Sequence, residues 1–191
     1  MPSPGDIFLD FEAVPYAFDT GLEYLIGMAR ISEQPGGGPR YESLWSFEPS
    51  AEKKTFEQFI GAVMDRWKRY PDLHIYHYAP YEQSAVKRLA GRHGTCTEEV
   101  DQLLRAGIFV DLYRIVRQAL RASVESYSIK QVEALYAFPR SIPPRDSVAA
   151  LQTFEVVLER ELLKKQEAER RARCEAEPEQ DTVIGATPAP Q

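Results

Sequence analysis

The stretch Gly5-Asp6-Ile7-Phe8-Leu9-Asp10-Phe11-Glu12-Ala13 decides how the chain folds, because it combines a strand-like apolar run with two acids. The large apolar residues predict a strand that is buried on both faces of a sheet. Asp10 and Glu12 are two positions apart, and alternate residues of a strand point to the same side. We therefore expect the two carboxylates to lie side by side on one surface of the sheet.

This pair of acids is a candidate metal site. Two close carboxylates at the end of a buried strand repel each other and lose hydration, which costs free energy. A divalent cation compensates for this cost, and Mg²⁺ and Mn²⁺ prefer oxygen ligands. The alternative is an exposed edge strand on which Asp10 and Glu12 are simply hydrated. The large apolar residues on both sides of the pair argue against this alternative.

Length and composition favour one soluble domain. A chain of 191 residues with 43% hydrophobic residues can bury one sizeable core. We expect this domain to cover residues 1–160, followed over 161–191 by a charged helical extension and a disordered tail rich in Pro, Ala and Thr. No apolar run is long enough to span a bilayer and no signal-peptide pattern occurs, which predicts a cytoplasmic protein that does not enter membranes.

Charge and cysteine content exclude few functions. The net charge of −6 argues against a protein that coats nucleic acid by bulk electrostatics, but an enzyme with a catalytic acidic cluster is compatible with it. Cys96 and Cys174 lie far apart, and the three histidines show no zinc-ligand spacing with them. A zinc site is therefore not expected.

The order of the predicted elements indicates a mixed α/β sheet. Three strands joined by turn-type connections suggest an antiparallel meander, and the later strands alternate with helices. This order is typical of an RNase H-like fold, in which the first strand lies centrally. The predicted strands cover residues 7–11, 21–31, 41–47, 73–78 and 108–110, and the predicted helices cover 50–70, 81–90, 98–105, 112–120, 128–136 and a long segment from about 146.

Further acids follow later strands or loops, where functional groups gather. Two-metal phosphoryl transfer needs about four carboxylates from separate elements. Glu82 opens a helix after the fourth strand, Asp146 opens the long helix, and Asp111 ends the fifth strand. Each has an ordinary structural interpretation: Glu82 as an acid that stabilises a helix dipole, and Asp111 and Asp146 as helix N-caps.

Several motifs in order make the chain resemble the RNase H-like nuclease domain that is found with RecB-like nucleases in bacteria. The likeness extends from about residue 6 to 159 and rests on residues 8–12, 21–27, 77–82, 110–113 and 125–130. That family is similar to the DEDD exonucleases, which use two metal ions. The resemblance implies that Asp10, Glu12, Glu82 and Asp146 are the catalytic, metal-binding acids, with Mg²⁺ or Mn²⁺ as the cofactor.

The chain departs from the DEDD pattern in one respect. The resemblance implies a His five residues, or a Tyr four residues, before the final Asp, where it orients the attacking water. Those positions are Ser141 and Ile142, and neither can act as a general base. The water could be activated by metal alone, the assignment of Asp146 could be out of register, or the activity could be weak.

Substrate contacts are predicted around the same acids. Tyr78 and Tyr81 flank Glu82 and could stack on an unpaired base, and Arg145 could contact a phosphate. The predicted function is a metal-dependent nuclease, more exonuclease-like (3′–5′) than endonuclease-like, acting on a single-stranded DNA or RNA end. The alternative is a catalytically weak or inactive nucleic-acid-binding module within a repair or defence complex, with a RecB-like nuclease or a helicase as its partner.

Overall fold

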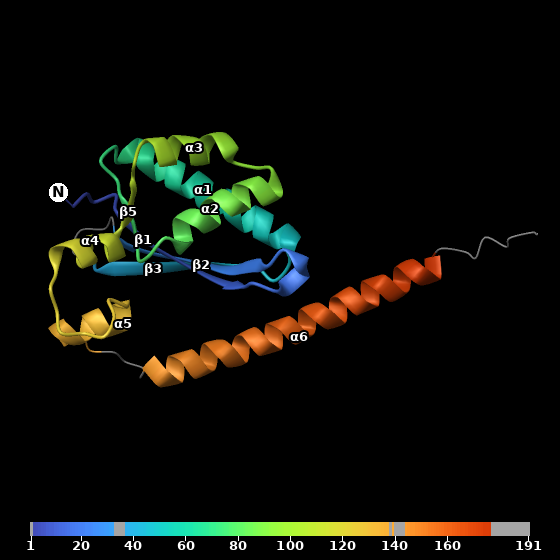
Figure 1. Ribbon diagram of the computed structural model, residues 1–191. Coiled ribbons are helices and arrows are strands. Elements are labelled where there is room, and N and C mark those ends of the chain that lie inside the picture. Colours follow the sequence, from blue (N-terminus) through green and yellow to red (C-terminus); the bar gives the residue numbers. More distant parts are fainter. Residues whose placement is uncertain (1, 33–36, 138, 140–143, 177–191) are drawn as a thin grey trace, which may run out of the picture.

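Strand β1 lies in the middle of a five-stranded mixed sheet. The structure is a computed structural model that describes residues 2–32, 37–137, 139 and 144–176 (Figure 1). The strand order is β3-β2-β1-β4-β5, in which β1 pairs antiparallel with β2 and parallel with β4. The strands are β1 (Ile7–Val14), β2 (Leu22–Ile31), β3 (Pro39–Trp45), β4 (Ile75–His77) and β5 (Phe109–Asp111). The predicted fold class and the central place of the first strand are confirmed.

The prediction that β1 is buried on both faces is wrong. Ile7, Leu9 and Phe11 are buried, whereas Phe8, on the other face, is 50% exposed. Asp10 and Glu12 share the face of Phe8, as the period of two requires. From residue 7 to 11, buried and exposed side chains alternate strictly. This alternation is not evident from hydropathy, because Phe8 is a large apolar residue on the open side of the sheet.

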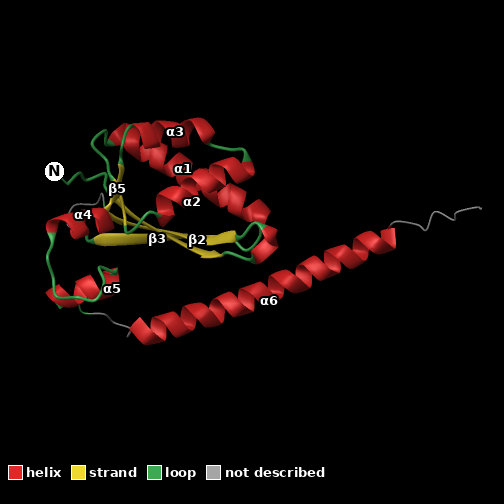
Figure 2. Cartoon of the chain, viewed as in Figure 1, coloured by secondary structure: helices red, strands yellow, loops and turns green. Residues whose placement is uncertain are grey.

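Three helices cover the buried face of the sheet. They are α1 (Pro49–Arg69), α2 (Tyr81–His93) and α3 (Thr97–Arg105), all above the sheet in Figure 2. Phe56, Phe59 and Leu89 from these helices are fully buried against the inward side chains of β1, β2 and β4. Burial of large apolar side chains of this kind stabilises a core by roughly 1.5–3 kcal/mol each.

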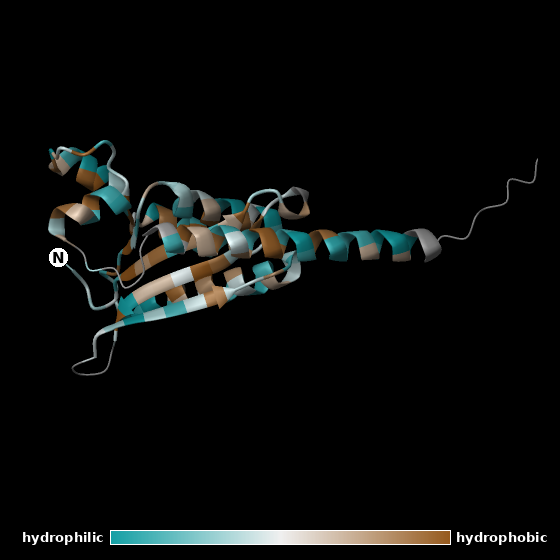
Figure 3. Ribbon diagram, turned by 90° about the horizontal axis from the view of Figure 1, so that it is seen from below, coloured by the Kyte–Doolittle hydropathy of each residue, from teal (hydrophilic) through white to brown (hydrophobic). Residues whose placement is uncertain are grey.

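The long helix α6 (Pro144–Ala176) runs along the opposite face and extends past the sheet (Figures 1 and 3). Phe154, Leu158 and Leu162 pack against Leu22 and Tyr24 of β2 in a second, smaller core. The predicted domain boundary at residue 160 falls inside this continuous helix, and Leu162 beyond it is still buried. The predicted disorder concerns a tail that lies, from residue 177 on, outside the described residues.

Shorter helical segments complete the fold. They are η1 (Ala17–Asp19) between β1 and β2, then α4 (Leu112–Ala119), α5 (Ile129–Val132) and η2 (Glu133–Tyr136) before α6. Among the described residues no helix is both long and apolar enough to cross a membrane.

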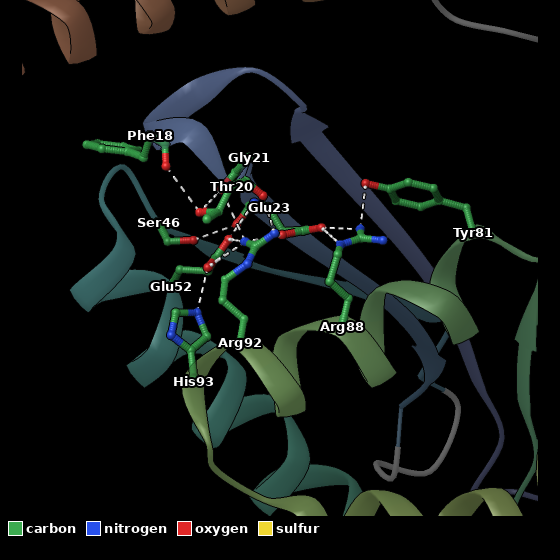
Figure 4. Close-up of polar contacts among 10 residues, drawn as sticks. All are labelled: Phe18, Thr20, Gly21, Glu23, Ser46, Glu52, Tyr81, Arg88, Arg92 and His93. Atoms are coloured by element: carbon green, nitrogen blue, oxygen red, sulfur yellow. Dashed lines mark hydrogen bonds and ion pairs between the residues drawn. The ribbon is translucent and has the colours of Figure 1, made fainter.

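An ionic network fastens the beginning of β2 to α1 and α2 (Figure 4). Arg92 Nη1 lies 3.0 Å from Glu23 Oε2 and 3.0 Å from Glu52 Oε1. Arg92 Nη2 donates to the backbone oxygen of Thr20 (2.6 Å), and His93 Nε2 lies 2.6 Å from Glu52 Oε2. Glu23 and Glu52 are both buried, so their charges depend on these cations.

Removal of the Arg92 charge is expected to destabilise the fold. We expect Arg92→Gln to lower the free energy of unfolding by about 2–3 kcal/mol, because two buried carboxylates lose a shared partner. The matched control is Arg88→Gln: Arg88 also binds Glu23, but its side chain is 41% exposed, so a loss below about 1 kcal/mol is expected. Urea unfolding of the three proteins measures both values, and equal losses would contradict the assignment.

Candidate functional site

Asp10 and Glu12 project from the open face of β1, side by side as predicted. Their register neighbours on β2 are Gly27 and Leu25, so uncharged residues flank them there. Asp10 is exposed over the residue as a whole, but its carboxylate is partly shielded from water. The lost hydration and the nearby charge of Glu82 raise the pKa of Asp10. Asp10 and Glu12 repel each other when both are ionised, because they lie on the same surface of the sheet.

Glu12 is the most strongly perturbed acid of the site. Lost hydration and the charges of Asp10, Glu155 and Glu82 raise its pKa to about 7, and the charge of Lys130 opposes the shift. Glu12 therefore experiences acids from β1, α2 and α6 at once. Such convergence of carboxylates from separate elements is the arrangement that divalent cations stabilise.

Glu82 brings a buried carboxylate to this site from the first turn of α2. The chain turns at Ala79, whose φ is 79°, and α2 begins at Tyr81, so that Glu82 faces back toward the end of β4. Glu82 is 4% exposed, and its Oε2 accepts no hydrogen bond. His77 Nδ1 lies 3.5 Å from Glu82 Oε2, but this nitrogen lies closer, at 2.7 Å, to the backbone oxygen of Ala79. A buried oxygen without a donor is what a cation ligand needs.

The acid that α6 contributes is Glu155, which sequence reasoning missed. The hydroxyl of Tyr24 donates to Glu155 Oε1 (3.5 Å), and the ring of Phe154 lies 5.2 Å from that of Tyr24. Asp146 is exposed in the first turn of α6, about 14 Å along the helix axis from Glu155. Besides lost hydration, the charge of Glu82 raises the pKa of Asp10, and the charges of Asp10, Glu155 and Glu82 raise the pKa of Glu12. Asp146 is not among these acids.

A signal for Glu155 was present in the sequence. Leu151, Glu155, Leu158 and Leu162 follow one another at spacings of four, three and four, so Glu155 lies on the apolar face of its helix. A charged residue in an apolar stripe is rarely placed there for packing alone. The predicted acid of this helix was instead Asp146, which opens the helix and which the resemblance to the DEDD exonucleases implied as the final acid.

Asp111 is an N-cap, as the structural interpretation of it predicted. Its Oδ1 accepts from the backbone N–H groups of Tyr113 (3.0 Å) and Arg114 (3.4 Å) at the start of α4. The same oxygen accepts from Ala79 N–H at 3.1 Å. Asp111 thus fixes the turn that precedes Glu82 and serves the site by positioning.

The tyrosines proposed as substrate contacts have internal partners. The Tyr78 hydroxyl donates to the backbone oxygen of Tyr127, and the Tyr81 hydroxyl accepts from Arg88 Nη2 at 3.4 Å. The rings have internal partners as well: the Arg88 guanidinium lies 5.5 Å from the centre of the Tyr81 ring, and the Tyr78 ring packs edge-to-face with Tyr113 at 5.7 Å. The side chain of Arg145 and the positions Ser141 and Ile142 lie outside the described residues.

The donor set of the site fits a hard divalent cation. All its members are carboxylate oxygens, which Mg²⁺ and Mn²⁺ prefer over softer ligands. Among the residues that the structure describes, no three of the His, Cys, Asp and Glu side chains already form a group that could hold an ion. Because the carboxylates repel one another, rotation of their side chains would accompany cation binding.

A mixed sheet with its first strand at the centre, together with acids gathered on the open face of that strand, defines an RNase H-like domain. The chain belongs to the RNase H superfamily, whose family profile matches residues 7–168. Membership of this superfamily indicates nuclease-type activity and nucleic acid as the partner, and RNase H-like nucleases generally use divalent metals. A search of curated proteins and a search of solved structures each found no match.

Proposed function

We propose that the chain is a two-metal nuclease that hydrolyses phosphodiester bonds of DNA or RNA in a 3′–5′ exonuclease-like manner. The single observation that carries this proposal is the crowding of acids at Glu12, which the charges of Asp10, Glu155 and Glu82 all affect and which combines residues of β1, α6 and α2. Acids from β1, α2 and α6 tolerate this crowding when cations lie between them. Asp10, Glu12, Glu82 and Glu155 are the proposed ligands.

The cations and two neighbouring side chains would have distinct roles in this reaction. Bound Mg²⁺ or Mn²⁺ would lower the pKa of an attacking water and stabilise the charge that develops on the phosphate. Lys130 is close enough to lower the pKa of Glu12, and its ammonium group would pair with a phosphate oxygen of the substrate. Lost hydration and the charges of Glu12 and Glu155 raise the pKa of Tyr24, so its hydroxyl stays protonated and orients Glu155 as a donor.

The finer family assignment is part of the proposal. The motifs around Asp10 and Glu82 support placement in the DEDD branch, beside the domain that accompanies RecB-like nucleases. A RecB-like nuclease or a helicase is then the proposed protein partner. With Glu155 as the final acid, the positions five and four residues before it are Ala150 and Leu151, and neither can act as a general base. The proposed nuclease therefore activates water through its cations.

A second candidate function is a nucleic-acid-binding module without turnover. It is favoured by the absence of a His five residues, or a Tyr four residues, before either Asp146 or Glu155. In that case the chain would bind nucleic acid whether or not Glu12 is present, and no metal would bring about cleavage at any pH.

Single-turnover cleavage of end-labelled single-stranded DNA and RNA tests the proposal. We expect cleavage with Mn²⁺, none with a chelator, and a rate at least about tenfold lower for Asp10→Ala, because one ligand is lost. The matched control is Asp65→Asn, an acid on the surface of α1 that is 73% exposed. Equal cleavage by wild type and Asp10→Ala would remove the nuclease proposal and leave the binding module.

A further inference from the structure

A row of aromatic residues crosses the open face of the sheet beside the acids. Tyr41 on β3 pairs with Ala29 on β2, which pairs with Phe8 on β1, which pairs with Tyr76 on β4. Phe8 and Tyr41 are 50% and 63% exposed, and the rings of Phe8 and Tyr76 stack with centroids 5.2 Å apart. We call Phe8, Tyr41 and Tyr76 the aromatic row.

The aromatic row lies one step along the strands from the proposed metal ligands. Asp10 follows Phe8 by two residues on the same face, which is roughly 7 Å along β1. Gly27, the neighbour of Asp10, keeps this region accessible to Tyr41: a Cβ atom there would lie 2.6 Å from the Tyr41 hydroxyl. The hydroxyl of Tyr41 thus reaches across β2 toward the acids, so the row and the acids form one continuous surface.

Helix α6 covers the other end of this face and leaves the row open. Tyr24 and Trp45 pack against Phe154 of α6, with ring centroids 5.2 and 5.8 Å from it. Trp45 lies four residues beyond Tyr41 on β3, so the covered part begins about 13 Å from the row. In Figure 3, which views the sheet from the side of α6, the helix covers only part of the sheet.

The chemistry of this surface selects unpaired bases. An exposed aromatic ring offers a face on which any base can stack, worth about 1–3 kcal/mol per base. The faces of bases inside a duplex are already occupied by their neighbours. The net charge of −6 gives the protein little sequence-independent attraction to phosphates, so affinity has to come from another source.

Resting on the proposed nuclease function, we propose that the aromatic row binds unpaired nucleobases next to the scissile phosphate. The occupant is a single strand whose phosphate lies at Asp10 and Glu12 and whose adjoining base or bases stack on Phe8 and Tyr41. The new element is the place of the bases, which lie on the sheet at the aromatic row and away from Tyr78 and Tyr81.

Binding of labelled oligonucleotides tests the aromatic row. Fluorescence anisotropy in Ca²⁺ compares a 12-nucleotide dT strand, the same strand with abasic sites, and a 12-base-pair duplex. For Phe8→Ala/Tyr41→Ala we expect about 10- to 100-fold weaker binding of the dT strand. The abasic strand should bind wild type as weakly as the dT strand binds the variant, with little further loss in the variant.

The matched control is Tyr16→Ala, since Tyr16 is 87% exposed and follows the far end of β1. Circular dichroism and thermal unfolding confirm that each variant is folded. The proposal is overturned if the double variant binds the dT strand like wild type, if wild type does not bind it, or if abasic and dT strands bind equally. An equal loss for strand and duplex, or capture of a protein segment by the row in place of the dT strand, also overturns it.

Cleavage assays in Mn²⁺ on the same proteins separate this proposal from the nuclease function. If the double variant cleaves and binds like wild type, the proposal that the aromatic row binds bases is contradicted and the nuclease proposal stands. Absent cleavage in wild type, with base-dependent binding that requires Phe8 and Tyr41, removes the nuclease and keeps the row as the binding surface.

Discussion

Replacement of Glu12 by Gln is expected to slow metal-dependent cleavage at least about 10³-fold and also to stabilise the metal-free protein. The loss follows from the central place of Glu12, which is close enough to feel Asp10, Glu82 and Glu155. A factor of 10³ corresponds to about 4 kcal/mol of transition-state stabilisation, a size expected when a cation loses a ligand. Single-turnover kinetics measure the loss.

The gain in stability follows from the pKa of Glu12. Its ordinary value is 4.5 and its value in the folded protein is about 7. Between these values the folded state binds more protons than the unfolded state, so metal-free protein loses stability as pH rises through this window. The upper bound is ~3 kcal/mol at pH 8, which solvent reduces, so Glu12→Gln should raise the melting temperature by a few degrees.

Cation binding carries the opposite dependence on pH. A carboxylate has to release its proton before it binds a cation, so Mn²⁺ affinity should rise about tenfold between pH 6 and pH 8. Isothermal titration calorimetry measures this change, and Glu12→Gln should flatten it. A metal-free Glu12→Gln protein that melts at or below the wild-type temperature at pH 8 would contradict the crowding at this position.

Replacement of Glu155 by Gln is expected to reduce cleavage at least about 10²-fold, whereas Asp146→Asn should stay within about threefold of wild type. Both substitutions remove one negative charge from α6, so they form a matched pair. Only Glu155 is near Glu12 and held by Tyr24 at 3.5 Å. Because Glu155→Gln removes one oxygen ligand of the proposed cation site, Mn²⁺ should bind more weakly in this variant. The weaker Mn²⁺ binding should accompany the slower cleavage.

The two variants decide which acid α6 contributes. Calorimetry with Mn²⁺ gives a reading that does not depend on turnover, and a Tyr24→Phe protein should show a smaller effect in the same direction as Glu155→Gln. The reverse ranking, with Asp146→Asn impaired and Glu155→Gln intact, would restore Asp146 as the final acid and would require the start of α6 to lie against β1.

The sequence made much of the fold accessible. The apolar run over residues 7–11, the helical spacing in α1 and the order of strands and helices led to the correct sheet with β1 at its centre. The strand was assigned two buried faces, because Phe8 is as apolar as its neighbours. Hydropathy records the nature of a side chain, but its surroundings are decided by distant elements, here by the part of the sheet that α6 covers.

The candidate site was predictable in its local part only. The period of two in β1 places Asp10 beside Glu12, and the start of α2 fixes the direction of Glu82. The helical spacing puts Glu155 on the apolar face of α6, but only the packing of α6 through Phe154 and Leu158 decides which strand that face meets. Asp111 accepts from three backbone N–H groups. The local preference of Asp for N-caps gave capping of α4 as one of two open interpretations, the other being a role in the site, and the structure shows the cap.

The attachment of α6 through a small core has a thermodynamic consequence. Leu158 and Leu162 hold the same helix that carries Glu155. In the proposed nuclease, docking of this helix and occupancy of the proposed cation site are therefore linked equilibria. Linkage is reciprocal. If a cation binds more tightly when α6 is docked, its binding increases the equilibrium constant for docking by the same factor by which docking increases the affinity for the cation. Any protein or peptide that competes for the surface beneath α6 would therefore act as a remote inhibitor, without touching an acid on β1.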